Sequence, residues 1–239
     1  MANRKVPFVS DEYYHLYNRG NSKQEIFLDE NDYRHFVKCL FVCNTSKNFK
    51  FRDHIIEPRI DAFDFEREDT LVSIGAWVLM PNHFHIYLKF SHKSDMWEKK
   101  NKKCEDKCRN NISEFMRKLL TAYTKYFNAK HKRTGGLYEG AFKSVRIQNN
   151  NHAKYLFSYI HLNPVKIIDS KWKENGINNP GLALEYLNAY KWSSYHDHRG
   201  ILRRENKILQ LSDFPNYFSN IQDFNSEIFS WLQYSECDE

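Results

Sequence analysis

The sequence has no long hydrophobic run. None of its 239 residues lies in an unbroken apolar stretch of about 18 residues, roughly the length that a membrane-spanning helix needs. Residues 1–5 are not followed by the apolar segment of a secretory signal. Internal repeats and low-complexity segments are also missing. We therefore expect a cytoplasmic protein with no membrane partner, built as one domain with extensions.

Cysteine is sparse and odd in number. The chain has five cysteines, and a cytoplasmic protein is not expected to pair them in disulfides. Cys39 and Cys43 lie four positions apart, as do Cys104 and Cys108. The usual zinc-binding pair has two residues between its thiols, so this spacing is wider. Reduced cysteines are the favoured interpretation, and a structural zinc site is the alternative.

Positive charge is present in modest excess and is unevenly placed. The formal net charge is +6, and the C-terminal end is acidic. The basic residues of the middle of the chain are Lys99, Lys100, Lys102, Lys103, Lys107, Arg109, Arg117, Lys118, Lys125, Lys130, Lys132, Arg133, Lys143 and Arg146. Such a region, mixed with tyrosines, fits a polyanion such as nucleic acid. A solvated helix face is the alternative.

The most informative segment is residues 81–90, PNHFHIYLKF, in which apolar and polar residues alternate. Phe84, Ile86, Leu88 and Phe90 share one parity. This period is typical of a β-strand with one buried face. His83 and His85 therefore leave the opposite face side by side, where two neutral imidazoles form half of a metal site. Ordinary polar residues on an exposed sheet face are the alternative.

The remaining pattern predicts an α+β fold. We expect strands at 13–19, 71–80, 83–90 and 138–147, and helices at 30–43, capped by Asp29 or Asn31, and from Ser113 onward. This order is the ferredoxin-like split βαβ arrangement, a four-stranded antiparallel sheet with helices on one face. The other face is then free to hold a site. Residues 44–69 and 91–112 are polar, charged segments that we interpret as insertions.

A further helix, predicted for residues 151–162, carries a polar stripe. His152, Tyr155, Tyr159 and Asn163 recur at three- and four-residue spacing, and Pro164 ends the helix. A phenol attacks a phosphodiester poorly at its ordinary pKa near 10, and a bound divalent cation would assist it. Imidazole and amide-oxygen ligands with open positions suit Mg²⁺ or Mn²⁺.

The choice of nucleophile stays open at this level. Tyr155 and Tyr159 are equal by spacing alone, and the offset to Asn163 together with Pro164 favours Tyr159. His15 is expected to be an ordinary surface histidine, and His161 points away from the stripe.

Five ordered segments give the chain a resemblance to a known family. They are YHLYNRGN (14–21), WVLMPNHFH (77–85), GAFKS (140–144), YIHLNPVK (159–166) and WSSY (192–195). The chain resembles the single-tyrosine HUH transposases of insertion sequences, most closely the REP-associated tyrosine transposases. Asparagine at position 163, where the classical branch has glutamine, matches the REP-associated branch.

The resemblance implies an enzyme that nicks and rejoins single-stranded DNA next to a hairpin through a 5′-phosphotyrosine intermediate. By position, Tyr159 would be the nucleophile, and His83, His85 and Asn163 would bind Mg²⁺ or Mn²⁺. Residues 1–168 would form the nuclease domain and 169–239 a helical extension. Relatives act as monomers or homodimers, so the oligomeric state stays open.

Four further residues are candidates for DNA contacts, and two other functions remain as alternatives. Arg19 and Asn21 lie at the end of the first strand, and Lys143 and Arg146 lie on the last, where each is either a DNA contact or a solvated side chain. The first alternative is a catalytically idle, domesticated protein that binds DNA hairpins. The second is a metal-dependent hydrolase that uses an activated water.

Overall fold

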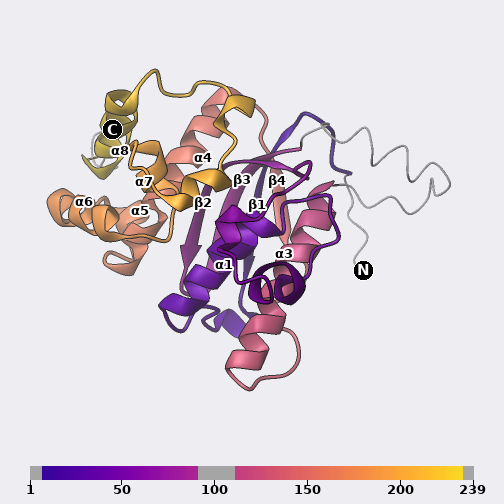
Figure 1. Cartoon of the computed structure of the whole chain (residues 1–239). Coiled ribbons are helices and arrows are strands. Elements are labelled where there is room, and N and C mark those ends of the chain that lie inside the picture. The colour runs from indigo at the N-terminus through magenta and orange to yellow at the C-terminus, as the bar shows by residue number, and fades with distance from the viewer. Residues whose placement is uncertain (1–6, 91–110, 234–239) are drawn as a thin grey trace.

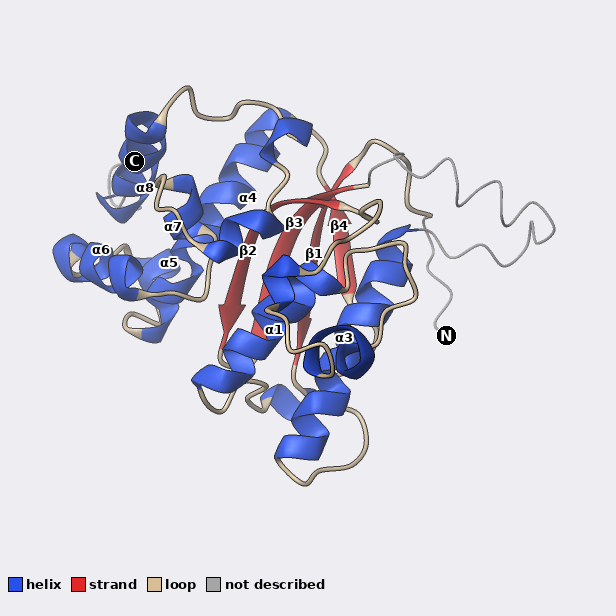
Figure 2. Ribbon diagram, viewed as in Figure 1, coloured by secondary structure: helices blue, strands red, loops and turns tan. Residues whose placement is uncertain are grey.

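A computed structural model describes residues 7–90 and 111–233 of the chain. Its strands are β1 (Tyr13–Arg19), β2 (Ser73–Met80), β3 (His83–Lys89) and β4 (Lys143–Arg146). They form one antiparallel sheet in the order β2-β3-β1-β4 (Figure 2). With α1 (Glu30–Val42) after β1 and α3 (Asn111–Lys130) after β3, the chain has the predicted ferredoxin-like order. The α+β prediction is confirmed.

The first core lies between the sheet and helices α1 and α3, which lie in front of it in Figure 1. Phe84, Ile86 and Leu88 of β3 are fully buried there, as their alternation predicts. Asp29 caps α1 by accepting hydrogen bonds from the backbone N–H groups of Asn31 and Asp32. The prediction that the second helix begins at Ser113 is wrong. The buried Asn111 and Ile112 already belong to α3, so Ser113 lies inside the helix.

The second face of the sheet is also covered, although we expected it to be free. Helix α4 (Asn150–Leu162) crosses it, and Phe157 and Ile160 of this helix form a second core with Val78 and Tyr87 of the sheet. Strands β2 and β3 are thus covered on both sides, and β2 is buried at every position. The space left for a site is therefore the end of the sheet near His83 rather than the whole face.

The C-terminal part of the chain is helical and lies along the edge of the sheet formed by β2 (Figure 1). Its helices are α5 (Trp172–Asn175), α6 (Pro180–Ala189), α7 (Tyr195–His198) and α8 (Ile221–Gln233). Between α6 and α7 the backbone pairs with β2: Leu79 N–H donates to the Trp192 carbonyl at 2.8 Å, and Ser194 N–H to the Trp77 carbonyl at 2.9 Å. The predicted domain boundary at residue 168 stays a prediction.

The two predicted insertions differ in what can be said of them. Residues 44–69 carry two short helical turns, Arg52–Ile56 and Ala62–Asp64, and bury Ile55 and Phe63 against the first core. Of the segment 91–112, residues 91–110 lie outside the described residues. That segment holds Cys104, Cys108 and the basic residues from Lys99 to Arg109.

The zinc alternative finds no support in the described part of the chain. Cys39 and Cys43 are buried and reduced on α1 and its end, and hydrogen bonding to Cys43, followed by burial, raises the pKa of the Cys39 thiol. Their possible partners Cys104 and Cys108 lie outside the described residues. Within residues 7–90 and 111–233, no three histidine, cysteine or acidic side chains gather as a metal site would require. Across the same ranges, no helix has the length and apolar character of a membrane span.

Candidate functional site

A cavity of about 590 Å³ opens where the β2–β3 turn, the end of β1 and the start of β4 meet α4. Its lining brings together five of the residues singled out from the sequence: Arg19, His83, His85, Lys143 and Tyr159. The other residues that line it are Tyr17, Asn18, Lys23, Asn82, Glu139, Gly140 and Ala141. Asn21, Arg146 and Asn163 are not part of this lining.

The two predicted metal ligands leave β3 on the same face. The centroids of the His83 and His85 rings lie 5.1 Å apart, with the ring planes at 88°. Both rings are largely removed from solvent, and His85 is only 7% exposed. Burial, followed by the charge of Lys166, lowers the pKa of His83 to about 4. The imidazole of His83 is therefore neutral at pH 7, which is the form that binds a cation.

The proton of the His83 ring can be assigned from its neighbour. Nδ1 of His83 lies 2.6 Å from Oδ1 of Asn82, and Nδ2 of Asn82 donates to the Lys23 carbonyl at 3.1 Å. Because a carbonyl only accepts, the amide of Asn82 is held with its oxygen toward His83. Nδ1 of the neutral ring must then carry the proton. The lone pair of His83 lies on Nε2 and is available to a cation.

His15 belongs to this site, contrary to the expectation of an ordinary surface histidine. Its Nε2 lies 2.8 Å from Nδ1 of His85, and the two rings stack with centroids 4.9 Å apart. The side chain is half-buried, and burial followed by the charge of His152 lowers its pKa to about 4. Antiparallel pairing produces this contact, because Tyr17 faces His85 across β1 and β3 and His15 lies diagonally beside it.

Tyr159 is the α4 tyrosine that reaches the histidines. Its ring centroid lies 5.5 Å from that of His85 and 6.4 Å from that of His15. Burial raises the pKa of its phenol above the usual value, and hydrogen bonding to Asn163 acts in the opposite direction. Tyr155, the rival nucleophile, is 47% exposed and does not line the cavity. The structure therefore places Tyr159, and not Tyr155, beside the imidazole pair.

Asn163 lies at the junction of two helices. Helix α4 ends at Leu162, and a 3₁₀ turn, Asn163–Ile167, continues the chain. The Asn163 side chain is fully buried and lies close enough to raise the pKa of His83 and to lower that of Tyr159. Within the described residues, neither its amide oxygen nor its nitrogen has a hydrogen-bond partner of good geometry. A buried amide without a partner costs stability, so its position calls for an explanation.

These residues fit a divalent cation. The imidazoles of His83 and His85 share one face, and the buried Asn163 amide lies next to one of them. Two neutral imidazoles and an amide oxygen form a mixed nitrogen–oxygen donor set with room for further ligands. The ligand roles remain predictions.

The predicted DNA-contacting residues are divided by the structure. Arg19 and Lys143 line the cavity, and Arg19 forms a two-point ion pair with Glu139, at 2.5 Å and 3.3 Å. Arg146 pairs with Tyr14 in the sheet, on the face that packs against α1 and α3, and forms an ion pair with Glu12 at 2.5 Å. Strand alternation thus turns Lys143 toward the histidines and Arg146 away from them. Asn21 is exposed in the turn after β1.

Tyr17, Asn82 and Glu139 also line the cavity and were not predicted from the sequence as site residues. Tyr17 shares its parity along β1 with His15 and Arg19, so alternation contains a signal for this group. Alternation along β1 does not indicate which strands pair with it, or in which register. The strand predicted for 138–147 begins only at Lys143, so Glu139 lies in the loop before β4 and not on a strand face.

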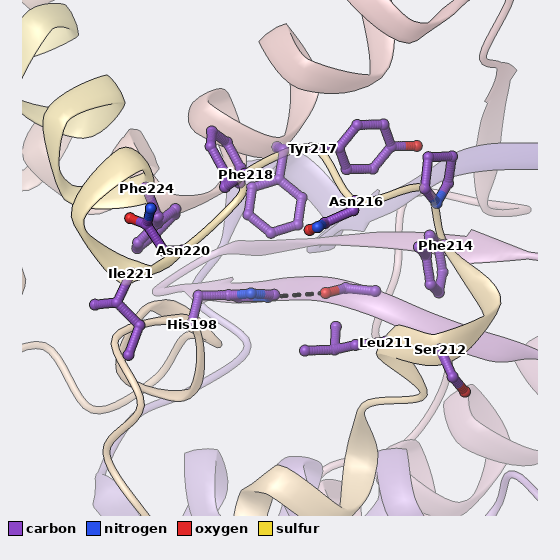
Figure 3. Close-up of a pocket in the computed structure, with 13 residues that line it drawn as sticks. His198, Leu211, Ser212, Phe214, Asn216, Tyr217, Phe218, Asn220, Ile221 and Phe224 are labelled. Atoms are coloured by element: carbon purple, nitrogen blue, oxygen red, sulfur yellow. Dashed lines mark hydrogen bonds between the residues drawn. The ribbon is translucent and has the colours of Figure 1, made fainter.

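A second cavity, of about 460 Å³, lies under the C-terminal segment (Figure 3). Its wall is mostly aromatic and includes Phe157, Phe214 and Phe224. Nε2 of His198 donates to the Gly75 carbonyl at 3.0 Å, so this ring nitrogen already has a structural partner. None of the residues singled out from the sequence lines this cavity, and we place the chemistry at the first.

Comparison with known proteins finds similarity among solved structures alone. No protein-family model and no curated sequence matches the chain. Among solved structures, the chain is similar to a REP-associated tyrosine transposase bound to a REP hairpin, with a TM-score of 0.47 and 15% identity over 86% of this chain and 90% of that one. It is also similar to a protein from Deinococcus radiodurans R1 assigned as a transposase, with a TM-score of 0.31 and 12% identity over 64% of this chain and 92% of the other.

Proposed function

We propose that this chain is a metal-dependent endonuclease and strand transferase for single-stranded DNA, with Tyr159 as its nucleophile. The observation that carries the proposal is the position of the Tyr159 ring, 5.5 Å from the His85 ring in a cavity that also holds His83. A phenol beside two imidazoles and a buried amide is a combination that suits metal-assisted phosphoryl transfer to tyrosine.

The chemistry follows from the groups present. The Tyr159 oxygen attacks the phosphorus of a phosphodiester, the bond to the 3′ oxygen breaks, and the DNA keeps a 5′ phosphate joined to the enzyme. The phenol proton passes to solvent, and the departing 3′ oxygen takes up a proton from solvent and leaves as a free 3′ hydroxyl. A strand with a free 3′ hydroxyl then attacks the phosphotyrosine and releases the phenol. A divalent cation, when bound, supplies positive charge for the phosphate and the departing oxygen.

The chain's own residues prepare these steps. His83, His85 and Asn163 would hold the cation, and burial keeps the pKa of His83 near 4 so that this ring does not need to lose a proton first. The raised pKa of Tyr159 makes an unaided phenolate rare at pH 7. We propose that a bound cation would assist the attack, because it would offset the negative charge that develops on the phosphate.

The substrate we propose is single-stranded DNA next to a hairpin. Arg19 and Lys143 place positive charge at the cavity that holds Tyr159, and cationic side chains of this kind bind phosphates. The choice of a hairpin comes from the sequence resemblance to REP-associated transposases.

The test uses a hairpin oligonucleotide with a single-stranded flank and a nick that lets the cleaved fragment diffuse away. Incubation of the full chain with Mg²⁺ or Mn²⁺ should yield a covalent adduct visible on a denaturing gel. Tyr159→Phe should lose the adduct and Tyr155→Phe should keep it. An adduct that survives Tyr159→Phe contradicts the assigned nucleophile. Cleavage by Tyr159→Phe without any adduct would instead indicate a hydrolase with an activated water.

A protein that only binds hairpins gives a different result. It would bind the oligonucleotide with an affinity that is independent of metal and falls steeply with salt, and it would form no adduct. The same samples run on a native gel with and without chelator separate this alternative from the enzyme.

A further inference from the structure

The contact between His15 and His85 has a chemical consequence for the proposed metal site. The two nitrogens that meet, Nε2 of His15 and Nδ1 of His85, are 2.8 Å apart. At this distance they share one proton, and either ring can be the donor. The two arrangements leave His85 in different tautomers, with different abilities to bind a cation.

If His15 donated, His85 would accept on Nδ1 and, as a neutral ring, would carry its proton on Nε2. That nitrogen could then bind no cation. If His85 donates, its Nδ1 carries the proton and Nε2 keeps its lone pair. His15 must then be neutral, with its own proton on Nδ1.

We propose that His15 is a positioning residue that accepts the Nδ1–H of His85 and thereby holds the His85 lone pair on Nε2 for a divalent cation. This inference rests on the proposed function, because it concerns the same metal site. It adds His15, a residue of β1, to a site whose two histidine ligands lie on β3. The sequence motif that contains His83 and His85 does not include it.

The neighbouring histidine supports this choice of donor. Asn82 fixes His83 in the tautomer with the proton on Nδ1, since the Asn82 amide is anchored to the Lys23 carbonyl. His85 in the same tautomer gives two imidazoles that present equivalent nitrogens on one face of β3. Each ring then has its own acceptor, a side-chain oxygen for His83 and a ring nitrogen for His85. Acceptors of this kind are the usual partners of metal-binding histidines.

The position of His15 is well determined by packing. The centroid of its ring lies 4.9 Å from that of His85 and 5.1 Å from that of Tyr17. Its backbone is held by the pairing of β1 with β3 and β4. The Tyr159 ring lies edge-on to it at 6.4 Å. A ring held between two strands and α4 can keep the hydrogen bond in one geometry, which an exposed histidine would not.

The experiment measures the affinity of the full chain for Mn²⁺ by calorimetry, without DNA. His15→Phe keeps an aromatic ring against His85 and removes the acceptor. His15→Gln offers an amide oxygen close to the place of Nε2. We expect affinity to fall by about 10- to 100-fold in His15→Phe and to recover most of the way in His15→Gln, as for other partners of metal-binding histidines. Tyr155→Phe is the matched control, because Tyr155 lies outside the cavity lining, and this variant should bind Mn²⁺ as the wild type does.

The tautomer can be observed directly, which guards against a variant that misfolds. In wild-type protein with ¹⁵N-labelled histidine and Mg²⁺, the His85 Nδ1 should show the shift of a protonated nitrogen and Nε2 that of an unprotonated one. The reverse pattern would overturn the inference. Equal Mn²⁺ affinities in folded His15→Phe and wild type would also overturn it and would leave the proposed function standing. A wild type that binds no Mn²⁺ would overturn both.

Discussion

The ring of Tyr155 lies parallel to the ring of Tyr159, with the planes 7° apart and the centroids 6.3 Å apart, one turn earlier along α4. Tyr155 is 47% exposed, and its ring centroid lies 5.6 Å from that of Trp231 in α8. The Tyr159 ring is the one that meets His85. Spacing along the helix alone cannot distinguish the two tyrosines. In the structure Tyr159 lines the cavity and Tyr155 does not.

The first prediction concerns these tyrosines. Tyr159→Phe should lower adduct formation by about 10³-fold or more, because the attacking oxygen is lost. Tyr155→Phe keeps the stacked ring, and adduct yield should stay within about twofold of wild type. Gel-based adduct assays under single-turnover conditions measure both. Equal losses in the two variants would show that the hydroxyl of Tyr155 takes part in the reaction.

The second prediction separates function from stability at Asn163. Its buried amide has no hydrogen-bond partner of good geometry in the described chain, and such a group costs about 1–3 kcal/mol. Asn163→Leu, of similar size, should therefore leave the free energy of unfolding unchanged or raise it by up to about 2 kcal/mol. Urea denaturation measures this change.

The same Asn163→Leu protein should lose Mn²⁺ affinity and adduct formation together. Calorimetry and the hairpin assay provide the comparison with wild type. A variant that is destabilised yet keeps full activity would indicate that Asn163 has a purely structural role.

The third prediction uses the Arg19–Glu139 ion pair at the cavity. Glu139→Gln removes a negative charge and releases Arg19, so affinity for a single-stranded hairpin should rise several-fold at moderate salt. Arg19→Gln should weaken binding and reduce the slope of log affinity against log salt by about 0.7, the value for one phosphate contact on a single strand. Fluorescence anisotropy over a salt series measures both effects.

A matched control lies on the opposite face of the sheet. Glu12 pairs with Arg146 there, also at 2.5 Å. Glu12→Gln changes the net charge of the protein by the same amount as Glu139→Gln and should leave hairpin affinity nearly unchanged. Equal effects of the two substitutions would mean that DNA responds to total charge rather than to the cavity.

The fourth prediction is a loss of stability in acid. Burial lowers the pKa of His198 from 6.5 to about 4, and its hydrogen bond to the Gly75 carbonyl only partly offsets this. Between pH 6.5 and 4, the His198 imidazole is therefore protonated in the unfolded chain and neutral in the folded chain. The stabilising contribution is complete above pH 6.5 and is lost as pH falls toward 4.

Urea denaturation at pH 7.5 and at pH 5 measures this loss. His198→Gln removes the titrating group. Between pH 7.5 and pH 5, the free energy of unfolding of this variant should therefore fall by about 2 kcal/mol less than that of the wild type. His15, His35 and His83 have pKa values lowered in the same direction and contribute to the wild-type loss. An identical pH dependence in wild type and His198→Gln would contradict the assignment of His198.

Local patterns were sufficient for the elements of this fold. The period-2 alternation from His83 to Lys89 predicted β3 and its buried face, and the spacing of Tyr33, Phe36 and Leu40 predicted α1. The order of elements then determined a four-stranded antiparallel sheet. The start of α3 was missed because Ser113 is a good cap by residue type, whereas buried residues before it extend the helix.

The covering of the second sheet face could not be predicted in the same way. Residues after 190 return to β2 over more than one hundred positions of sequence, and Ser193 pairs with Val78. No local period reports such a contact.

The sequence by itself determined that His83 and His85 share one strand face and that Tyr159 and Asn163 share one helix stripe, because both facts follow from the periods of strand and helix. The tertiary structure decided that strand and stripe face one another, that His15 rather than bulk water meets His85, and that Arg146 turns away from the cavity. These relations depend on register between strands and on the angle at which α4 crosses the sheet. Both are set by packing between residues far apart in the chain, and a period within one element carries no information about them.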